Sequence, residues 1–360
     1  MLQIENKNMS SIFSERFKSA RLLSGLSLQE VADSLEKNVT RQAIYRYEKG
    51  EVLPDSKTLD ELSKLFNVRS DFFFREAKVE IGTVEYRKLK ISAKEESRIQ
   101  EQTKDYLSRY LEIEEILGIK TEFVNPLNGF PKVSSYANVN AAAELLRDKW
   151  NLGLIAISNI AELLEDKHIK ILKLNADAGF DGLQTMANQT IPVIAYNERQ
   201  MNKKDRIRFT LLHELAHLLL SFDENLTHKD IETLCHQFAG AMLLPEKVIK
   251  EELGAFRHRL SVNELGNIKK QYGISMQAIV LRANVCGIVN TNFTKQFFTI
   301  MKDNGWKIDE PVDFEGHEES GRFEQLVYRA LSEELISISK AAALKNMSLA
   351  AFKQQMISFS

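Results

Sequence analysis

The run from Phe209 to Leu220 constrains this chain most, because it joins helix-forming apolar residues to two regularly spaced histidines. The run has no glycine or proline, and His213 and His217 stand four positions apart. On a helix, residues four apart project from one face, one turn apart. Two imidazoles so placed can hold one Zn²⁺, and Glu214 beside them can take a proton from water. The alternative is a core helix that happens to carry two histidines.

A catalytic zinc also needs a third protein ligand and one position left open for water. The extended pattern with glycine and a further histidine is absent after His217, so we expect the ligand on a later helix that ends near Pro245. The residues there with suitable side chains are His228, Asp230, Glu232 and His236. Glu232 and His236 are four apart and share a helix face, so one can ligate while the other supports it.

Length and composition predict a protein of two or three domains, since the chain has 360 residues. The net charge of -2 gives no sign of nucleic-acid binding, so any basic surface must be local. Two cysteines exclude a disulfide framework, and no apolar run is long enough to cross a membrane. The N-terminus has no basic segment followed by an apolar one, so we expect a cytoplasmic protein without a signal peptide.

Residues 9–75 predict a bundle of four short helices. Ser27 and Glu30 form a capping box, and Thr40 caps a third helix from Arg41 to Glu48. Two short helices, a turn and a polar third helix are the helix-turn-helix arrangement, whose recognition helix lies in the major groove. Four basic residues stand against one acidic residue between positions 37 and 49, which suits contact with phosphates. The alternative is a small helical bundle with a charged face in solvent.

These residues also resemble a known family. Residues 25–32 and 39–50, followed by Pro54 and Leu59, are similar to the Cro/phage-repressor-type (XRE) DNA-binding domain. The resemblance implies double-stranded operator DNA as a partner, with Gln29 and Thr40 contacting phosphates or framing the operator. The side chains that it directs to bases or backbone are Arg41, Gln42, Tyr45 and Arg46.

Residues 76–135 form a predicted connector. Val84 to Leu89 suggests a short extended piece, and Ala93 to Leu117 predicts one long helix with a narrow apolar stripe. The stripe can pack on its own chain or form the seam of a homodimer. Asn125 to Pro131 reads as a loop at the boundary of the next domain.

Residues 136–285 predict an α+β domain. Two helices precede strands at 169–174 and 191–196, the segment 177–182 between them is rich in turn residues, and the histidine helix follows. We expect a small antiparallel sheet whose edge can hold an extended peptide by main-chain pairing. Residues 286–360 predict a mostly helical C-terminal segment.

Arg208 to Leu220, followed by Glu232 and the segment 237–245, resembles the ImmA/IrrE family of zinc metallopeptidases. The resemblance implies a zincin-like domain with His213 and His217 as ligands and Glu214 as general base. It also implies Glu232 as the third ligand. The family usually has Ala-Asn where Cys235-His236 stands here, so His236 remains the alternative ligand or a hydrogen-bond partner of one.

Members of this family are fused to, or encoded with, XRE regulators, and some cut a repressor protein. We therefore expect a DNA-binding transcription regulator that carries a zinc-dependent endopeptidase and cleaves a regulatory protein in a stress or mobile-element response. The alternative is a regulator or antitoxin-like autorepressor whose peptidase-like domain is a non-catalytic sensor or interaction module. The expected fold is a helix-turn-helix bundle, an α+β zincin-like metallopeptidase domain and a helical C-terminal segment.

Overall fold

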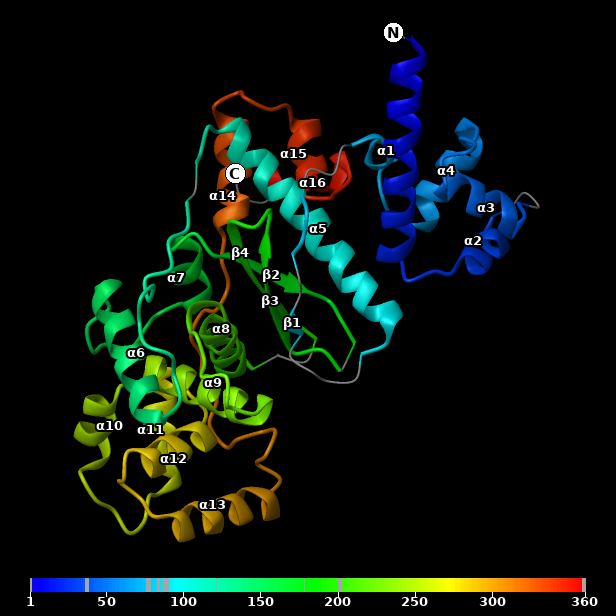
Figure 1. The fold of residues 1–360 in the computed structure, drawn as a ribbon. Helices are drawn as coiled ribbons and strands as arrows, with labels where there is room; N and C mark the ends of the chain where they lie inside the picture. Colours follow the sequence, from blue (N-terminus) through cyan, green and yellow to red (C-terminus); the bar gives the residue numbers. More distant parts are fainter. Residues whose placement is uncertain are drawn as a thin grey trace. The chain divides into compact units, whose positions relative to one another are not determined.

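The computed structural model describes residues 2–35, 39–75, 79–82, 85–86, 91–120, 122–177, 179–199 and 203–357. The chain divides into two compact units (Figure 1). The first contains residues 1–82, 88–121 and 321–360, and the second contains residues 83–87 and 122–320.

The first unit begins with the helix-turn-helix bundle. Its elements are α1 (Leu2–Leu23), α2 (Leu28–Ser34), α3 (Arg41–Glu48), α4 (Ser56–Leu65) and the 3-10 turn η1 (Ser70–Phe74). The predicted capping box begins α2: Ser27 Oγ accepts from the Glu30 amide at 3.2 Å, and the Ser27 amide donates to the Glu30 carboxylate at 2.6 Å. Buried rings of Phe13, Phe17 and Phe73 form the core together with Ile44 of α3.

The long helix α5 (Ala93–Ile116) packs against this bundle and against the C-terminal helices α14 (Arg322–Ser332), α15 (Ile338–Leu344) and α16 (Leu349–Ile357). The buried Arg16 of α1 donates to Asp105 of α5 at 3.2 Å. Further along α5, Tyr110 and Ile113 are fully buried among the C-terminal helices. The apolar stripe therefore packs on its own chain over these residues, and the homodimer seam stays a prediction.

The second unit contains a four-stranded sheet in the order β1-β3-β4-β2. The strands are β1 (Glu85–Tyr86), β2 (Lys170–Leu174), β3 (Gly182–Ala187) and β4 (Ile191–Asn197). The expectation of an antiparallel sheet was wrong in part: β3 pairs antiparallel with β1 and β4, but β2 runs parallel to β4. The sheet is mixed because β3, which the sequence analysis missed, runs antiparallel to β4 and so reverses the chain once more between β2 and β4, which then run parallel. The rest of the predicted extended piece at 84–89 lies outside the described residues.

The second unit also contains the helices that carry the candidate site and others beyond the sheet (Figure 1). They are α6 (Tyr136–Lys149), α7 (Ile160–Asp166), α8 (Lys204–Leu219), α9 (His228–Leu243), α10 (Glu246–Leu253), α11 (Val262–Tyr272), α12 (Met276–Val285) and α13 (Thr291–Asp303). Helix α8 packs on β3 and β4 on one side and on α9 on the other, and α9 packs in turn on α6. This position between two layers buries most of α8.

The segment that follows α13 braces α8 from outside the sheet. Arg208 of α8 and Glu318 are both fully buried and form an ion pair at 2.7 Å. The other carboxylate oxygen of Glu318 accepts from the first amides of α7, at 2.6 and 2.8 Å. Glu310 acts similarly, since it pairs with the buried Lys269 at 2.8 Å and accepts from the first amide of α12. Two carboxylates of one irregular segment thus satisfy buried cations and helix N-termini together.

Candidate metal centre

Helix α8 presents its two histidines on one face, as their spacing predicts. The His213 side chain is fully buried, whereas the His217 side chain is 16% exposed. Their Nε2 atoms lie 3.2 Å apart. Because His217 is one turn further along α8, the pair lies at the boundary between the protein interior and solvent.

Glu232 of α9 completes the group. Its carboxylate oxygens lie 3.4 Å from His213 Nε2 and 3.2 Å from His217 Nε2. Four ligands held tetrahedrally at Zn–N distances of about 2.0–2.1 Å stand roughly 3.3 Å apart, so the three observed separations suit one such ion. Among the described residues, His213, His217 and Glu232 form the one group of three histidine, cysteine or acidic side chains whose ligand atoms converge.

The other candidates on α9 have different surroundings. The His236 ring stacks on Phe209 of α8, with ring centroids 5.8 Å apart, and contacts the His213 ring at 4.5 Å. Asp230 is engaged in the capping box of α9, where it accepts from the Thr227 hydroxyl at 2.6 Å. The structure therefore brings Glu232 to the histidine nitrogens and places the His236 ring beside His213, where it can hold that imidazole in orientation.

The histidines also control the ionisation of Glu232. Burial by itself raises the pKa of this carboxyl, but hydrogen bonds and charge interactions with His213 and His217 outweigh burial and hold the pKa well below its usual range. Glu232 is therefore a carboxylate, the form that binds a metal ion.

Glu214, one position after His213 on α8, contacts the sheet. Its side chain is almost fully buried, and it lies against the first residue of β3: a Cβ atom on Gly182 would stand 3.2 Å from Glu214 Oε1. The preceding residue, Asp181, pairs with Arg206 of α8 at 3.1 Å. The start of β3 thus fixes the position of the carboxylate that the motif predicts as general base.

Three supporting residues escaped the sequence analysis as parts of the site: Gly182, Arg208 and Glu318. Gly182 was noted only as the end of the turn-rich segment 177–182, and its contact with Glu214 depends on the missed strand β3. The sequence signal for β3 is Asn188, because asparagine is favoured where a hairpin turn requires a positive φ angle. In the structure Asn188 and Gln189 have φ angles of 48° and 64°. Nothing in the sequence pairs Arg208 with a residue 110 positions away.

The predicted DNA-reading residues lie on the outer face of α3 and near it. Arg41, Gln42 and Tyr45 are exposed, and together with Thr40 they line a surface hollow of about 550 Å³. Thr40 also caps α3, where its hydroxyl oxygen accepts from the Ala43 amide at 3.2 Å.

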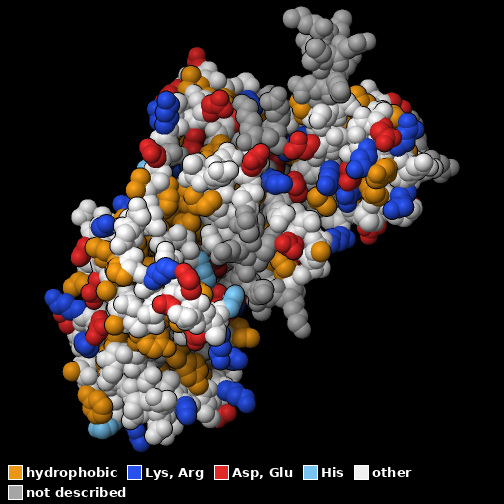
Figure 2. Space-filling view, in the orientation of Figure 1, with side chains coloured by type: hydrophobic (Ala, Val, Ile, Leu, Met, Phe, Trp, Pro, Cys, Tyr) orange, Lys and Arg blue, Asp and Glu red, His pale blue; other side chains and the backbone are white. Residues whose placement is uncertain are grey.

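Two other predicted DNA contacts already have partners in their own unit. Gln29 donates to Asp33 at 2.8 Å, and the exposed Arg46 pairs with Glu51 at 3.3 Å. Lys37, counted in the local basic balance, lies outside the described residues. In Figure 2 lysine and arginine side chains lie among acidic ones on the helix-turn-helix part, so its surface is mixed rather than uniformly basic.

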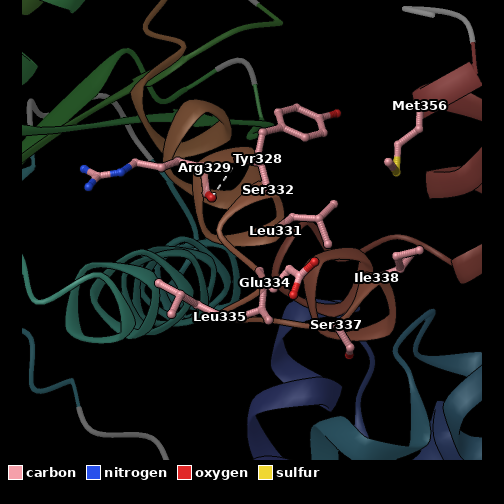
Figure 3. Close-up of a pocket in the computed structure, with 10 residues that line it drawn as sticks. Tyr328, Arg329, Leu331, Ser332, Glu334, Leu335, Ser337, Ile338 and Met356 are labelled. Atoms are coloured by element: carbon pink, nitrogen blue, oxygen red, sulfur yellow. Dashed lines mark hydrogen bonds between the residues drawn. The ribbon is translucent and has the colours of Figure 1, made fainter.

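A second groove, of about 890 Å³, opens among the C-terminal helices of the first unit (Figure 3). Its apolar lining includes Leu335, Ile338 and Met356. The groove lies in the first unit and the metal-ligand group in the second, and none of its lining residues belongs to the predicted DNA face. Among the described residues, no helix is long and apolar enough to span a bilayer.

Comparison with known proteins agrees with both halves of this description. Residues 164–284 match the family model of the IrrE N-terminal-like domain, a peptidase family, and residues 17–73 match the helix-turn-helix model. The chain joins these two domains. The matched segments contain α8 and α9 in one case and α2 to α4 in the other.

The helix-turn-helix part also has a curated relative. It is similar to the SPbeta prophage-derived uncharacterized HTH-type transcriptional regulator YonR of Bacillus subtilis (strain 168), with 42% identity over 64 residues. The match spans 18% of this chain and 57% of that relative, so the chain covers little more than half of that relative's length.

Proposed function

We propose that this protein is a DNA-binding regulator that carries a zinc-dependent endopeptidase. The observation that supports catalysis best is the convergence of His213, His217 and Glu232 at separations of 3.2 to 3.4 Å, with Glu214 beside them on α8. Two histidines and one carboxylate are a ligand set found in catalytic zinc sites, where water takes the fourth position.

The chain's own residues divide the chemistry between them. Bound zinc would polarise the scissile carbonyl and lower the pKa of a water molecule. Glu214 of α8, which lies against the start of β3, takes the proton from that water and passes it to the leaving nitrogen. Glu232 and the two histidines hold the ion, and the stacked rings of Phe209 and His236 keep His213 in place.

The helix-turn-helix bundle would bring the peptidase domain to DNA. Arg41 and Gln42 lie on the exposed face of α3, and arginine and glutamine suit bidentate contact with guanine and adenine. A peptidase carried on such a domain acts near an operator, so the proposed substrate is a regulatory protein rather than bulk polypeptide.

The test uses full-length protein loaded with zinc and its Glu214→Gln variant. We expect wild type to cleave at least one protein encoded beside its own gene and the variant to bind zinc equally without cleaving. A variant that cleaves as fast as wild type refutes the role of Glu214. A zinc-loaded wild type that cleaves none of these proteins, with or without operator DNA, favours a sensor or interaction domain.

A further inference from the structure

The connector contributes a strand to the sheet of the second unit. Glu85 pairs with Gln184 and Tyr86 with Leu183, so β1 lies antiparallel on the edge of β3. The chain up to Gly82 and the chain from Lys88 to Thr121 belong to the first compact unit, whereas residues 83–87 belong to the second. A short piece of the connector is therefore held by a unit to which its neighbours in sequence do not belong.

The edge of β3 that pairs with β1 lies close to Glu214, the proposed general base. Leu183, opposite Tyr86, follows Gly182, and a Cβ atom on Gly182 would lie 3.2 Å from Glu214 Oε1. Strands rise about 3.3 Å per residue and lie about 4.8 Å apart, which places the main chain of Tyr86 roughly 10 Å or less from that carboxylate.

If β1 is left aside, the edge strands of this sheet are β3 and β2, and β3 is the one beside the site. The strand order β1-β3-β4-β2 places β2 at the far edge, with β4 between it and β3. Without β1, the outer main-chain groups of β3 would be unpaired and able to bind an extended peptide as an added strand. A peptide bound there would run past Glu214, as a substrate of this site must.

We propose that β1 occupies the edge on which an extended substrate docks, so that the connector competes with substrate in cis. This inference rests on the proposed peptidase function and adds the way in which the site is regulated. A two-residue strand offers few hydrogen bonds, so a substrate segment several residues longer can displace it.

Competition of this kind has a defined kinetic form. A site that is free for a fraction of the time binds its ligand with an apparent dissociation constant divided by that fraction. If β1 is docked about nine-tenths of the time, its removal strengthens substrate binding about tenfold. The rate of the chemical step stays unchanged, because no catalytic side chain is altered.

The experiment uses two matched double variants of the full-length, zinc-loaded chain. Glu85→Pro with Tyr86→Pro removes the main-chain donors of β1, whereas Glu85→Ala with Tyr86→Ala keeps them. Hydrogen–deuterium exchange is followed in the peptide that covers Gly182 to Ala187. We expect about tenfold faster exchange in the proline variant and near-wild-type exchange in the alanine variant, with unchanged zinc content in both.

The second measurement adds Glu214→Gln to each variant and uses fluorescein-labelled β-casein, an unfolded polypeptide, as the probe. We expect the proline variant to bind casein about three- to tenfold more tightly than the alanine variant. Equal exchange rates in the two variants overturn the docking of β1. Faster exchange with unchanged casein binding overturns the role of the edge in substrate docking.

These outcomes separate the inference from the proposed function. Faster exchange together with tighter casein binding supports the docking edge even if the chains with Glu214 intact cleave nothing, and in that case only the proposed catalysis fails.

Discussion

Gly182 lies against Glu214 so closely that a methyl group at position 182 would fit only if its neighbours moved. A Cβ atom at position 182 would stand 3.2 Å from Glu214 Oε1, 3.1 Å from the Ala195 carbonyl oxygen and 3.0 Å from Thr210. The backbone oxygen cannot retreat without bending β4, so an added methyl group would require the Thr210 and Glu214 side chains to shift by a few tenths of an ångström. The conformation of Glu214 thus depends on the absence of a side chain on β3.

We predict that Gly182→Ala lowers kcat by about tenfold, since displacements well under 1 Å of a reacting group already cost catalysis. Zinc content should stay at the wild-type level, because none of the three proposed ligands is among the atoms nearest to a Cβ at position 182. Zinc analysis and steady-state kinetics on the identified substrate check both statements. Gly240→Ala is the matched control, since the nearest atom to its Cβ, Arg282 Cδ, is 3.6 Å away. Equal kcat values for the two variants would contradict the contact's importance.

The roles of Glu232 and His236 lead to a second prediction. Glu232→Ala removes one converging carboxylate, so zinc affinity should fall by more than the roughly 10–100-fold that loss of a ligand's hydrogen-bond partner causes. His236→Phe retains a ring that can stack on Phe209 and His213, and zinc affinity should stay within about tenfold of wild type. Competition with a chromogenic chelator measures both constants. The reverse order of effects would make His236 the third ligand.

The buried pair Arg208–Glu318 predicts a stability effect without any change in the ligands. Both side chains are fully buried, so Arg208→Met leaves an uncompensated carboxylate and should lower the free energy of unfolding by about 3–5 kcal/mol. Adding Glu318→Leu should recover part of the loss, because the unpaired charge is then gone. Urea unfolding followed by tryptophan fluorescence reports on this unit alone, since Trp150 and Trp306 both lie in it.

Lys132→Met provides the control for that measurement. Lys132 pairs with Glu224 at 2.6 Å, but the two side chains are 56% and 85% exposed. Solvent screens such a pair, so the variant should lie within about 1 kcal/mol of wild type. If Arg208→Met is equally mild, the segment after α13 does not brace α8.

The predictable parts of the site were those carried by local spacing. The four-residue separation of His213 and His217 specifies a shared helix face, and the family resemblance pointed to Glu232 before His236. The capping box at Ser27 was readable for the same reason, since its partners are three positions apart. Helical periodicity and caps depend on residues three or four positions apart, so they can be predicted from the sequence.

The parts that escaped prediction depend on distant pairing. β3 follows directly on the turn-rich segment 177–182, and its pairing with β1 and β4 involves residues that local sequence patterns do not connect. The parallel run of β2 beside β4 requires a crossover that no local pattern encodes. Glu318 stands in an irregular segment, and its function there comes from burial beside Arg208, which the tertiary structure alone provides.

The exposed face of α3 carries the last prediction, which concerns Gln42. Its neutral amide can contact an adenine edge, so Gln42→Ala should weaken binding to DNA selected from a random duplex pool by about 1–3 kcal/mol. The salt dependence of binding should not change, because a neutral side chain releases no counterions. Arg41→Ala should instead lower the slope of log affinity against log salt by about 1 if Arg41 contacts a phosphate.

Lys57→Ala is the control for this pair of variants, since Lys57 lies on α4 of the same bundle with a side chain that is 66% exposed. Fluorescence anisotropy with the selected duplex and a scrambled one measures affinity and preference together. If Gln42→Ala keeps the affinity of wild type and its preference for the selected duplex, the exposed face of α3 does not recognise bases through Gln42. If Lys57→Ala weakens binding as much as Gln42→Ala, general charge attraction accounts for the interaction.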